Sequence, residues 1–150
     1  LRKWTDEGKL YGVEVYNMKG YTSIDYWVET GKISDFGKYE IAKKVPNLEI
    51  YDSAAFVKYT VKPYSFEEIY YVRSGVWKHY HKNGTLASEG NYLPWPFIII
   101  TPRTKEDEDN PGIMYNGEDF LKDGIWNYYD EKGNLIKTET YKNGLLDKKK

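Results

Sequence analysis

The chain of 150 residues contains no cysteine and has no surplus of either charge. The absence of cysteine excludes disulfide bonds and thiolate metal sites. Lysine and arginine number 22 against 23 aspartates and glutamates, so no basic surface is expected that would bind nucleic acid. The longest apolar run, residues 97–100, is far too short to span a membrane.

Alanine and leucine are also sparse, which argues against a helical bundle. Aromatic residues make up 17% of the chain, and 16 of them are tyrosines. Tyrosine favours the half-buried surface of a pleated sheet. The composition therefore favours β structure.

A repeat is visible in the second half of the chain, where residues 75–92 align without a gap with residues 124–141. The matched pairs are Gly75 and Gly124, Trp77 and Trp126, Tyr80 and Tyr129, Gly84 and Gly133, Leu86 and Leu135, and Tyr92 and Tyr141. Six matches that include both tryptophans of the template make chance an unsatisfactory explanation. Internal repeats of this kind specify a fold before any single motif does.

The N-terminal part carries the same template with a shorter period. Residues 4–16 align with residues 27–39, and this alignment pairs Gly8 with Gly31. Together the four clear units lie near residues 1–20, 21–40, 74–92 and 123–144. Two worn units, meaning copies that match the template at fewer positions, are expected near residues 45–66 and 95–122. Six units in all leave no room for a second domain.

Each unit reads as a β-hairpin, with an aromatic strand, a polar turn and a second strand rich in threonine and aliphatic residues. Gly84 and Gly133 stand where the turn requires a positive φ. Isolated hairpins are marginal in water, but consecutive hairpins pair edge to edge and bury aromatic ladders. The sequence therefore predicts a single all-β domain, residues 1–150, in which consecutive antiparallel hairpins form one elongated twisted meander sheet.

The template Gly-x-Trp-x-x-Tyr-x3-Gly-x-Leu-x5-Tyr-x-x-Gly, present at residues 75–92 and 124–144, resembles the MORN-repeat variant of bacterial proteins often described as YwqK-family antitoxins. The resemblance implies a non-enzymatic repeat module that contacts other proteins, with a toxin as one partner. Related MORN repeats also occur attached to phosphatidylinositol-4-phosphate 5-kinases. The alternative that follows is a module for a membrane surface or phospholipid headgroup, without kinase activity of its own.

The triplet Asp35-Phe36-Gly37 matches the magnesium-binding motif of protein kinases. A kinase would also need a glycine-rich loop, a strand lysine and a catalytic loop before this triplet. None of these occurs in the 34 residues that precede Asp35. The repeat alignment instead places the triplet in the return strand of the second hairpin, at positions that we expect the template to leave free.

Other motifs for chemistry are weak. Residues 107–118 match part of an EF-hand loop, but Pro111 stands where a ligand oxygen is needed. His79 and His81 would share one face of a strand without an evident third metal ligand. A solvated acidic loop and two half-exposed histidines are the preferred interpretations. We expect no catalytic residue, metal site or cofactor.

Trp95 and Phe97 lie outside the repeat template, so packing within the repeat does not explain them. They are the candidates for an exposed interaction patch on an unidentified protein partner. A membrane surface is the less favoured partner because the net charge is only −1. The chain begins at Leu1, so we expect an N-terminal piece to have been removed, and the location stays open between the cytoplasm and export.

Overall fold

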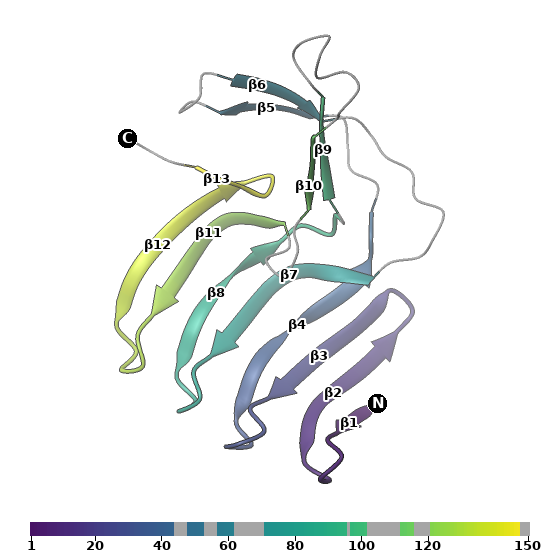
Figure 1. Cartoon of the computed structure of the whole chain (residues 1–150), viewed down its shortest axis with the longest axis vertical. Coiled ribbons are helices and arrows are strands. Elements are labelled where there is room, and N and C mark those ends of the chain that lie inside the picture. Colours follow the sequence, from purple (N-terminus) through teal and green to yellow (C-terminus); the bar gives the residue numbers. More distant parts are fainter. Residues whose placement is uncertain are drawn as a thin grey trace.

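The computed structural model describes residues 1–43, 48–52, 57–61, 71–95, 97–101, 112–115 and 121–147. Every regular element in these ranges is a β-strand, which confirms the predicted all-β class (Figure 1). The strands are β1 (Arg2–Trp4), β2 (Leu10–Asn17), β3 (Gly20–Tyr26), β4 (Ile33–Ile41), β5 (Leu48–Asp52), β6 (Val57–Val61), β7 (Tyr71–Tyr80), β8 (Leu86–Tyr92), β9 (Phe97–Thr101), β10 (Gly112–Tyr115), β11 (Lys122–Tyr129), β12 (Leu135–Lys142) and β13 (Leu145–Leu146). No helix long and apolar enough to cross a bilayer occurs in the described ranges.

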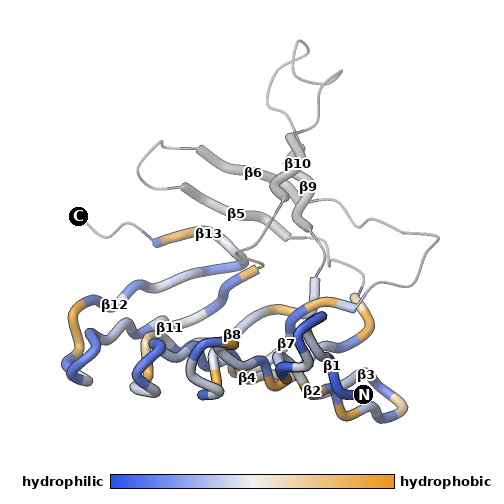
Figure 2. Tube along the Cα trace, turned by 60° about the horizontal axis from the view of Figure 1, so that its bottom comes forward, coloured by the Kyte–Doolittle hydropathy of each residue, from blue (hydrophilic) through white to orange (hydrophobic). Residues whose placement is uncertain are grey.

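Nine of these strands form the main sheet, in the order β1-β2-β3-β4-β7-β8-β11-β12-β13. Each neighbouring pair is antiparallel. The predicted meander of hairpins is therefore confirmed. Figure 2 shows hydrophobic and hydrophilic residues interspersed along its strands, as expected for a sheet whose side chains alternate between two faces.

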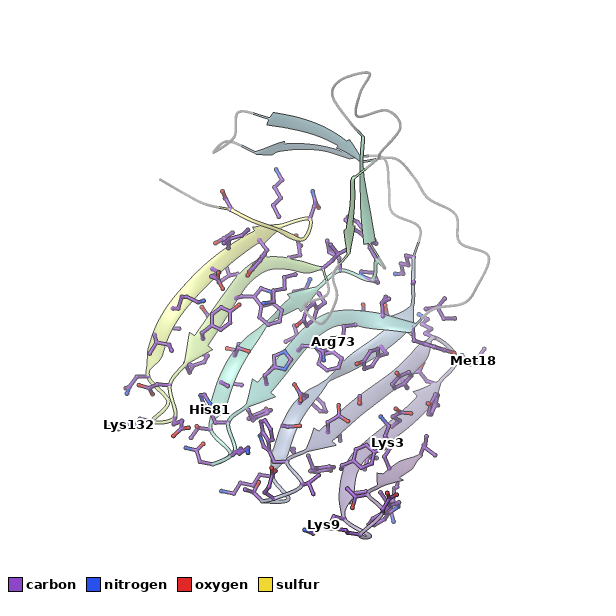
Figure 3. All side chains as sticks on the ribbon, in the orientation of Figure 1. Lys3, Lys9, Met18, Arg73, His81 and Lys132 are labelled. Carbon is purple, nitrogen blue, oxygen red and sulfur yellow. The ribbon has the colours of Figure 1, made fainter. Side chains whose placement is uncertain are left out.

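The turns at one end of the main sheet depend on glycine. Gly8, Gly31, Gly84 and Gly133 have φ angles of 78°, 67°, 92° and 88°, a left-handed conformation that residues with a Cβ rarely adopt. Figure 3 shows this end of the sheet, where Lys9, His81 and Lys132 mark three of the four turns. The same sequence position thus reverses the chain in all four clear units.

The strands of the two segments predicted as worn repeats do not continue the main sheet. They form a second antiparallel sheet in the order β10-β9-β6-β5, which lies beyond the end of the main sheet opposite the glycine turns (Figure 1). The expectation that these hairpins would extend one meander is wrong. The physical reason is that a tryptophan on β7 packs against β4 and a tryptophan on β11 packs against β8. Each pair of strands must therefore be adjacent, which leaves no place between them for another hairpin. The division of the chain into repeat units otherwise stays a prediction.

Candidate functional site

The strand registers divide the side chains of the main sheet between two faces. One face, which we call the aromatic face, carries Tyr16, Tyr21, Tyr39, Trp77, His79, Tyr92, Trp126 and Tyr128. The opposite face, which we call the open face, carries Val15, Ile24, Phe36, Lys38, Val76, Lys78 and Ile125. The two faces have different roles.

Each repeat tryptophan on the aromatic face lies over a glycine of the preceding strand. Trp77 of β7 is fully buried and covers Gly37 of β4, where an alanine Cβ would overlap the Cγ, Cδ2 and Cε2 atoms of the indole. Trp126 of β11 covers Gly90 of β8 in the same way. We call these two glycines the tryptophan seats. Each seat admits no side chain.

The indole nitrogens fix the same arrangement twice. Trp77 Nε1 donates to the carbonyl oxygen of Lys38 at 3.0 Å, and Trp126 Nε1 donates to that of Asn91 at 3.1 Å. In both cases the acceptor is the residue that follows the seat glycine. A buried indole N–H needs such a partner, so the hydrogen bond and the seat together select the strand that lies alongside.

A bulge in front of each tryptophan directs it over the neighbouring strand. Gly75 and Gly124 lie inside strands but have φ angles of 69° and 68°. Phe36 pairs with Lys78 and Lys38 pairs with Ser74, so residues 75–77 of β7 oppose the single residue 37. The register between β8 and β11 shifts in the same way around residues 124–126. Glycine bulges that re-aim a side chain are a known device of β-sheets.

A cation covers each indole. The Arg73 guanidinium lies 4.4 Å from the centroid of the Trp77 ring (labelled in Figure 3), and Lys122 Nζ lies 4.8 Å from that of Trp126. Arg73 and Lys122 occupy equivalent positions of the repeat, each two residues before the bulge glycine. A cation over an indole contributes roughly 0.5–2 kcal/mol, more when it is desolvated.

The remaining rings join these layers into one core. The ring centroids of Tyr16 and Tyr21 are 4.9 Å apart, those of Tyr21 and Tyr39 are 4.8 Å apart, and those of Tyr39 and Trp77 are 5.2 Å apart. Because its tryptophans are fully buried, the aromatic face is the hydrophobic core of the main sheet. The repeat tryptophans Trp77 and Trp126 therefore offer no surface to a ligand.

The one histidine in this core links two strands. The His79 ring stacks between the indoles of Trp77 and Trp126, with centroid distances of 6.2 and 6.1 Å. Its Nδ1 shares a hydrogen bond with Asp35 Oδ1 of β4. Burial opposes ionisation of Asp35, but the hydrogen bond and charge of His79 outweigh it and hold the pKa of Asp35 below its usual value.

His81 does not join His79 in a metal site. Its Nε2 lies 2.8 Å from the carbonyl oxygen of Tyr129 at the turn end of the sheet. Among the described residues, no group of three or more His, Cys, Asp or Glu side chains is arranged to hold a metal ion. The candidate EF-hand segment, residues 107–118, lies largely outside the described residues.

Asp25 is an unfavourable charge on this face, because it lies directly opposite Asp35 on the neighbouring strand. Burial raises the pKa of Asp25, the charge of Lys3 partly offsets this, and the charge of Asp35 adds to the rise. Like charges directly opposite each other destabilise a strand pair. The two aspartates therefore have opposite effects on stability.

We expect Asp25→Asn to raise the thermal unfolding midpoint at pH 7. A carboxyl group whose folded pKa is raised stabilises the fold when protonated, and this contribution is lost as the pH rises through that pKa. Asparagine does not ionise, so the Asp25→Asn variant avoids this loss of stability as the pH rises. The matched control is Asp35→Asn: because the folded pKa of Asp35 is depressed, its stabilisation is present above about pH 4 and is lost at lower pH. This variant is therefore expected to lower the midpoint at pH 7. Melting curves at pH 4 and pH 7 measure the unfolding midpoints of both variants. An equal decrease of the midpoint in the two variants would contradict the opposite effects assigned to Asp25 and Asp35.

The open face presents apolar side chains to solvent. The exposed fractions are 59% for Val15, 41% for Phe36, 63% for Val76 and 62% for Ile125. Phe36 lies directly opposite Ile24 on β3, and Val76 lies two residues from Lys78, the partner of Phe36 on β7. Ile24, Phe36 and Val76 therefore lie close together on the neighbouring strands β3, β4 and β7, with Val15 beyond them on β2, and clustered exposed apolar residues mark interaction sites.

The candidate residues from the sequence fall into three groups. Gly8, Gly31, Gly84 and Gly133 are at turns, and Gly75 and Gly124 are at bulges. Trp77, Trp126, Tyr92 and Tyr141 lie in the core, whereas Tyr80, Leu86 and Tyr129 are half-buried and Leu135 is exposed. Trp95 is half-buried just after β8, and the side chain of Phe97 lies outside the described residues, so their role as an interaction patch stays a prediction.

The interpretation of Asp35-Phe36-Gly37 as free positions is wrong for Asp35 and Gly37, whereas Phe36 occupies a position that the template leaves free. Asp35 binds His79, Phe36 is exposed on the open face, and Gly37 is a tryptophan seat. One signal in the sequence was available: Gly37 and Gly90 both stand six residues after a turn glycine. Glutamates occupy that position in the first and last units, where no tryptophan lies above.

The fold and the repeated tryptophan layers define a protein built from stacked β-hairpin repeats. Residues 73–93 and 122–143 match the family model described as MORN repeat variant, so the chain carries two units of this repeat. The matched segments contain both bulge glycines and both core tryptophans. The match is to a repeat module and not to a catalytic domain. No curated protein and no solved structure matches the chain.

Proposed function

We propose that this protein is a non-catalytic binding module that docks a partner protein on the open face of the main sheet. The observation that carries the proposal is the exposure of Phe36 and Val76 near the centre of that face, with Val15 also exposed two strands from Phe36 on β2. The repeat tryptophans are buried in the core, so their side chains are not available to contact a partner. Interaction surfaces characteristically combine an apolar centre with a polar surround.

A toxin is the first partner to test, because the repeat template resembles that of antitoxin-labelled proteins. Such a partner would be neutralised by binding alone, which is compatible with a module that carries no metal-binding cluster among its described residues. A membrane surface is less well supported. The net charge of −1 gives no long-range attraction to anionic lipids.

Phe36→Ser is expected to abolish co-purification of a stoichiometric protein partner from the native host, because the substitution removes the central apolar side chain of the face. The matched control is Leu135→Ser. Leu135 is 58% exposed but lies beside the turn at Gly133, away from Phe36. Quantitative mass spectrometry of tagged protein measures the recovered partner. Equal recovery with wild type and Phe36→Ser would rule out this face as the docking site.

A further inference from the structure

A row of aromatic rings crosses the main sheet on its aromatic face, with one ring from each of six neighbouring strands. The rings belong, in order, to Tyr16 of β2, Tyr21 of β3, Tyr39 of β4, Trp77 of β7, Tyr92 of β8 and Trp126 of β11. Successive ring centroids are 4.9, 4.8, 5.2, 6.1 and 4.8 Å apart. This ring row therefore runs without a break from a buried indole to Tyr16, which is 56% exposed.

The ring at the exposed end has a proton acceptor beside it. The Tyr16 hydroxyl donates to Glu14 Oε2, and this hydrogen bond raises the pKa of Tyr16, so the phenol keeps its proton at neutral pH. Burial opposes ionisation of Glu14, but hydrogen bonds from Lys3 (labelled in Figure 3) and from Tyr16 outweigh it and hold the pKa of Glu14 below its usual value. Glu14 is therefore a carboxylate positioned to accept the phenolic proton.

The composition of the chain decides which side chains lose an electron first. The protein has no cysteine, so tyrosine and tryptophan are its side chains most readily oxidised by one electron. A hole on a buried indole is filled by an electron from a neighbouring ring. An oxidised phenol is a much stronger acid than a carboxylic acid, so it passes its proton to a carboxylate within hydrogen-bond reach. Loss of that proton leaves a neutral tyrosyl radical and holds the hole at that residue.

We propose that the ring row is a relay that carries oxidising equivalents from the buried tryptophans to Tyr16. A one-electron oxidant at the β11 end of the row, such as a peroxyl radical, removes an electron from Trp126 and is itself reduced. Electrons pass from ring to ring toward Trp126, Tyr16 loses one electron, and its phenolic proton moves to Glu14. Ascorbate in solution returns one electron to the Tyr16 radical, and Glu14 returns the proton. This activity is independent of the proposed docking function.

Tyr71 offers an alternative exit from the row. Its ring centroid lies 5.6 Å from that of Tyr21, and the side chain is 47% exposed. Among the described residues, no carboxylate accepts a hydrogen bond from the Tyr71 hydroxyl. Because Tyr16 has such an acceptor and Tyr71 has none in the described part of the chain, Tyr16 is the favoured exit. Tyr71→Phe is therefore the matched control.

A photo-oxidant attached at the far end of the row tests the relay. Because the chain has no cysteine, Ile125→Cys provides a single attachment point for a ruthenium polypyridyl complex beside Trp126. This point is five strand spacings, or roughly 24 Å, from β2. The protein is irradiated by the flash-quench method with a nitroso spin trap present, and peptide mass spectrometry locates the trapped radical. The adduct is expected at Tyr16, both in labelled Ile125→Cys and in its Tyr71→Phe derivative.

Two conservative variants of the labelled protein interrupt the relay. Tyr21→Phe keeps a ring in the row but removes the oxidisable phenol, and Glu14→Gln keeps the size of the side chain but removes the carboxylate. Both are expected to lose the adduct at Tyr16, while tryptophan fluorescence verifies that each is folded. Undiminished trapping at Tyr16 in either variant would overturn the inference. An adduct found mainly at Tyr71, or confined to rings beside the label such as Tyr128, would also overturn it.

Discussion

Gly90→Ala is expected to destabilise the protein by about 3 kcal/mol. Its Cβ would occupy the space of three indole atoms of Trp126. The indole is fully buried and bonded to the carbonyl oxygen of Asn91, so it has no free space into which to move. Overpacking of a closed core costs about 1–3 kcal/mol and occasionally more. Urea denaturation followed by tryptophan fluorescence measures the change in the free energy of unfolding.

Glu139→Ala is the matched control, because Glu139 occupies the same position of the last unit and, although it pairs with Trp126 on β11, the following strand β13 carries no tryptophan that could cover it. Its loss removes a partly exposed pairing with Lys137 and a hydrogen bond with Tyr128, at a cost of about 1 kcal/mol or less. If Gly90→Ala cost no more than Glu139→Ala, the requirement for a seat without a side chain would be wrong.

The second large effect is expected for Trp77→Ala, which should cost about 3–5 kcal/mol, the usual range for truncating a buried aromatic residue. Trp77 anchors β7 on β4, supports Tyr39 and Tyr92, and lies beneath Arg73. Trp4→Ala is the control, since Trp4 is 53% exposed and its loss should cost less than about 1 kcal/mol. Equilibrium urea denaturation of both variants gives the comparison.

A double-mutant cycle tests the seat itself. Gly37→Ala should be costly in wild type but nearly neutral in the Trp77→Ala background, where the indole no longer covers residue 37. Residues in direct contact show such non-additivity, whereas independent sites add. Strict additivity of the two changes would mean that the tryptophan and the glycine act separately.

The sequence was sufficient to predict the β-hairpin meander, because turn glycines and aromatic strands recur at fixed spacings. It was not sufficient to predict which strands lie side by side. That choice depends on Trp77 reaching Gly37 across a gap of 40 residues, and on Trp126 reaching Gly90 across 36 residues. Such contacts between units are visible only when the glycine of one unit is considered together with the tryptophan of the next.

The open face was missed for a different reason. Phe36 and Val76 occupy variable positions of the repeat, so the template carries no information about them. The bulge at Gly75 sets the face on which Val76 lies, and Phe36 takes the face opposite to that of its neighbour Gly37, which Trp77 covers. No local sequence pattern fixes either in advance. The seats are set by packing between units, whereas the docking surface is set by the positions that packing leaves unused.

Site-specific photo-cross-linking tests most directly which face binds the partner. A benzoylphenylalanine residue is introduced at position 36 on the open face or, as the control, at position 16 on the aromatic face. Tyr16 is 56% exposed, so both positions are accessible to a partner. Irradiation in the native host should produce a discrete cross-linked protein from position 36 and none from position 16. A cross-link from position 16 alone would place the partner on the aromatic face and contradict the proposed docking site.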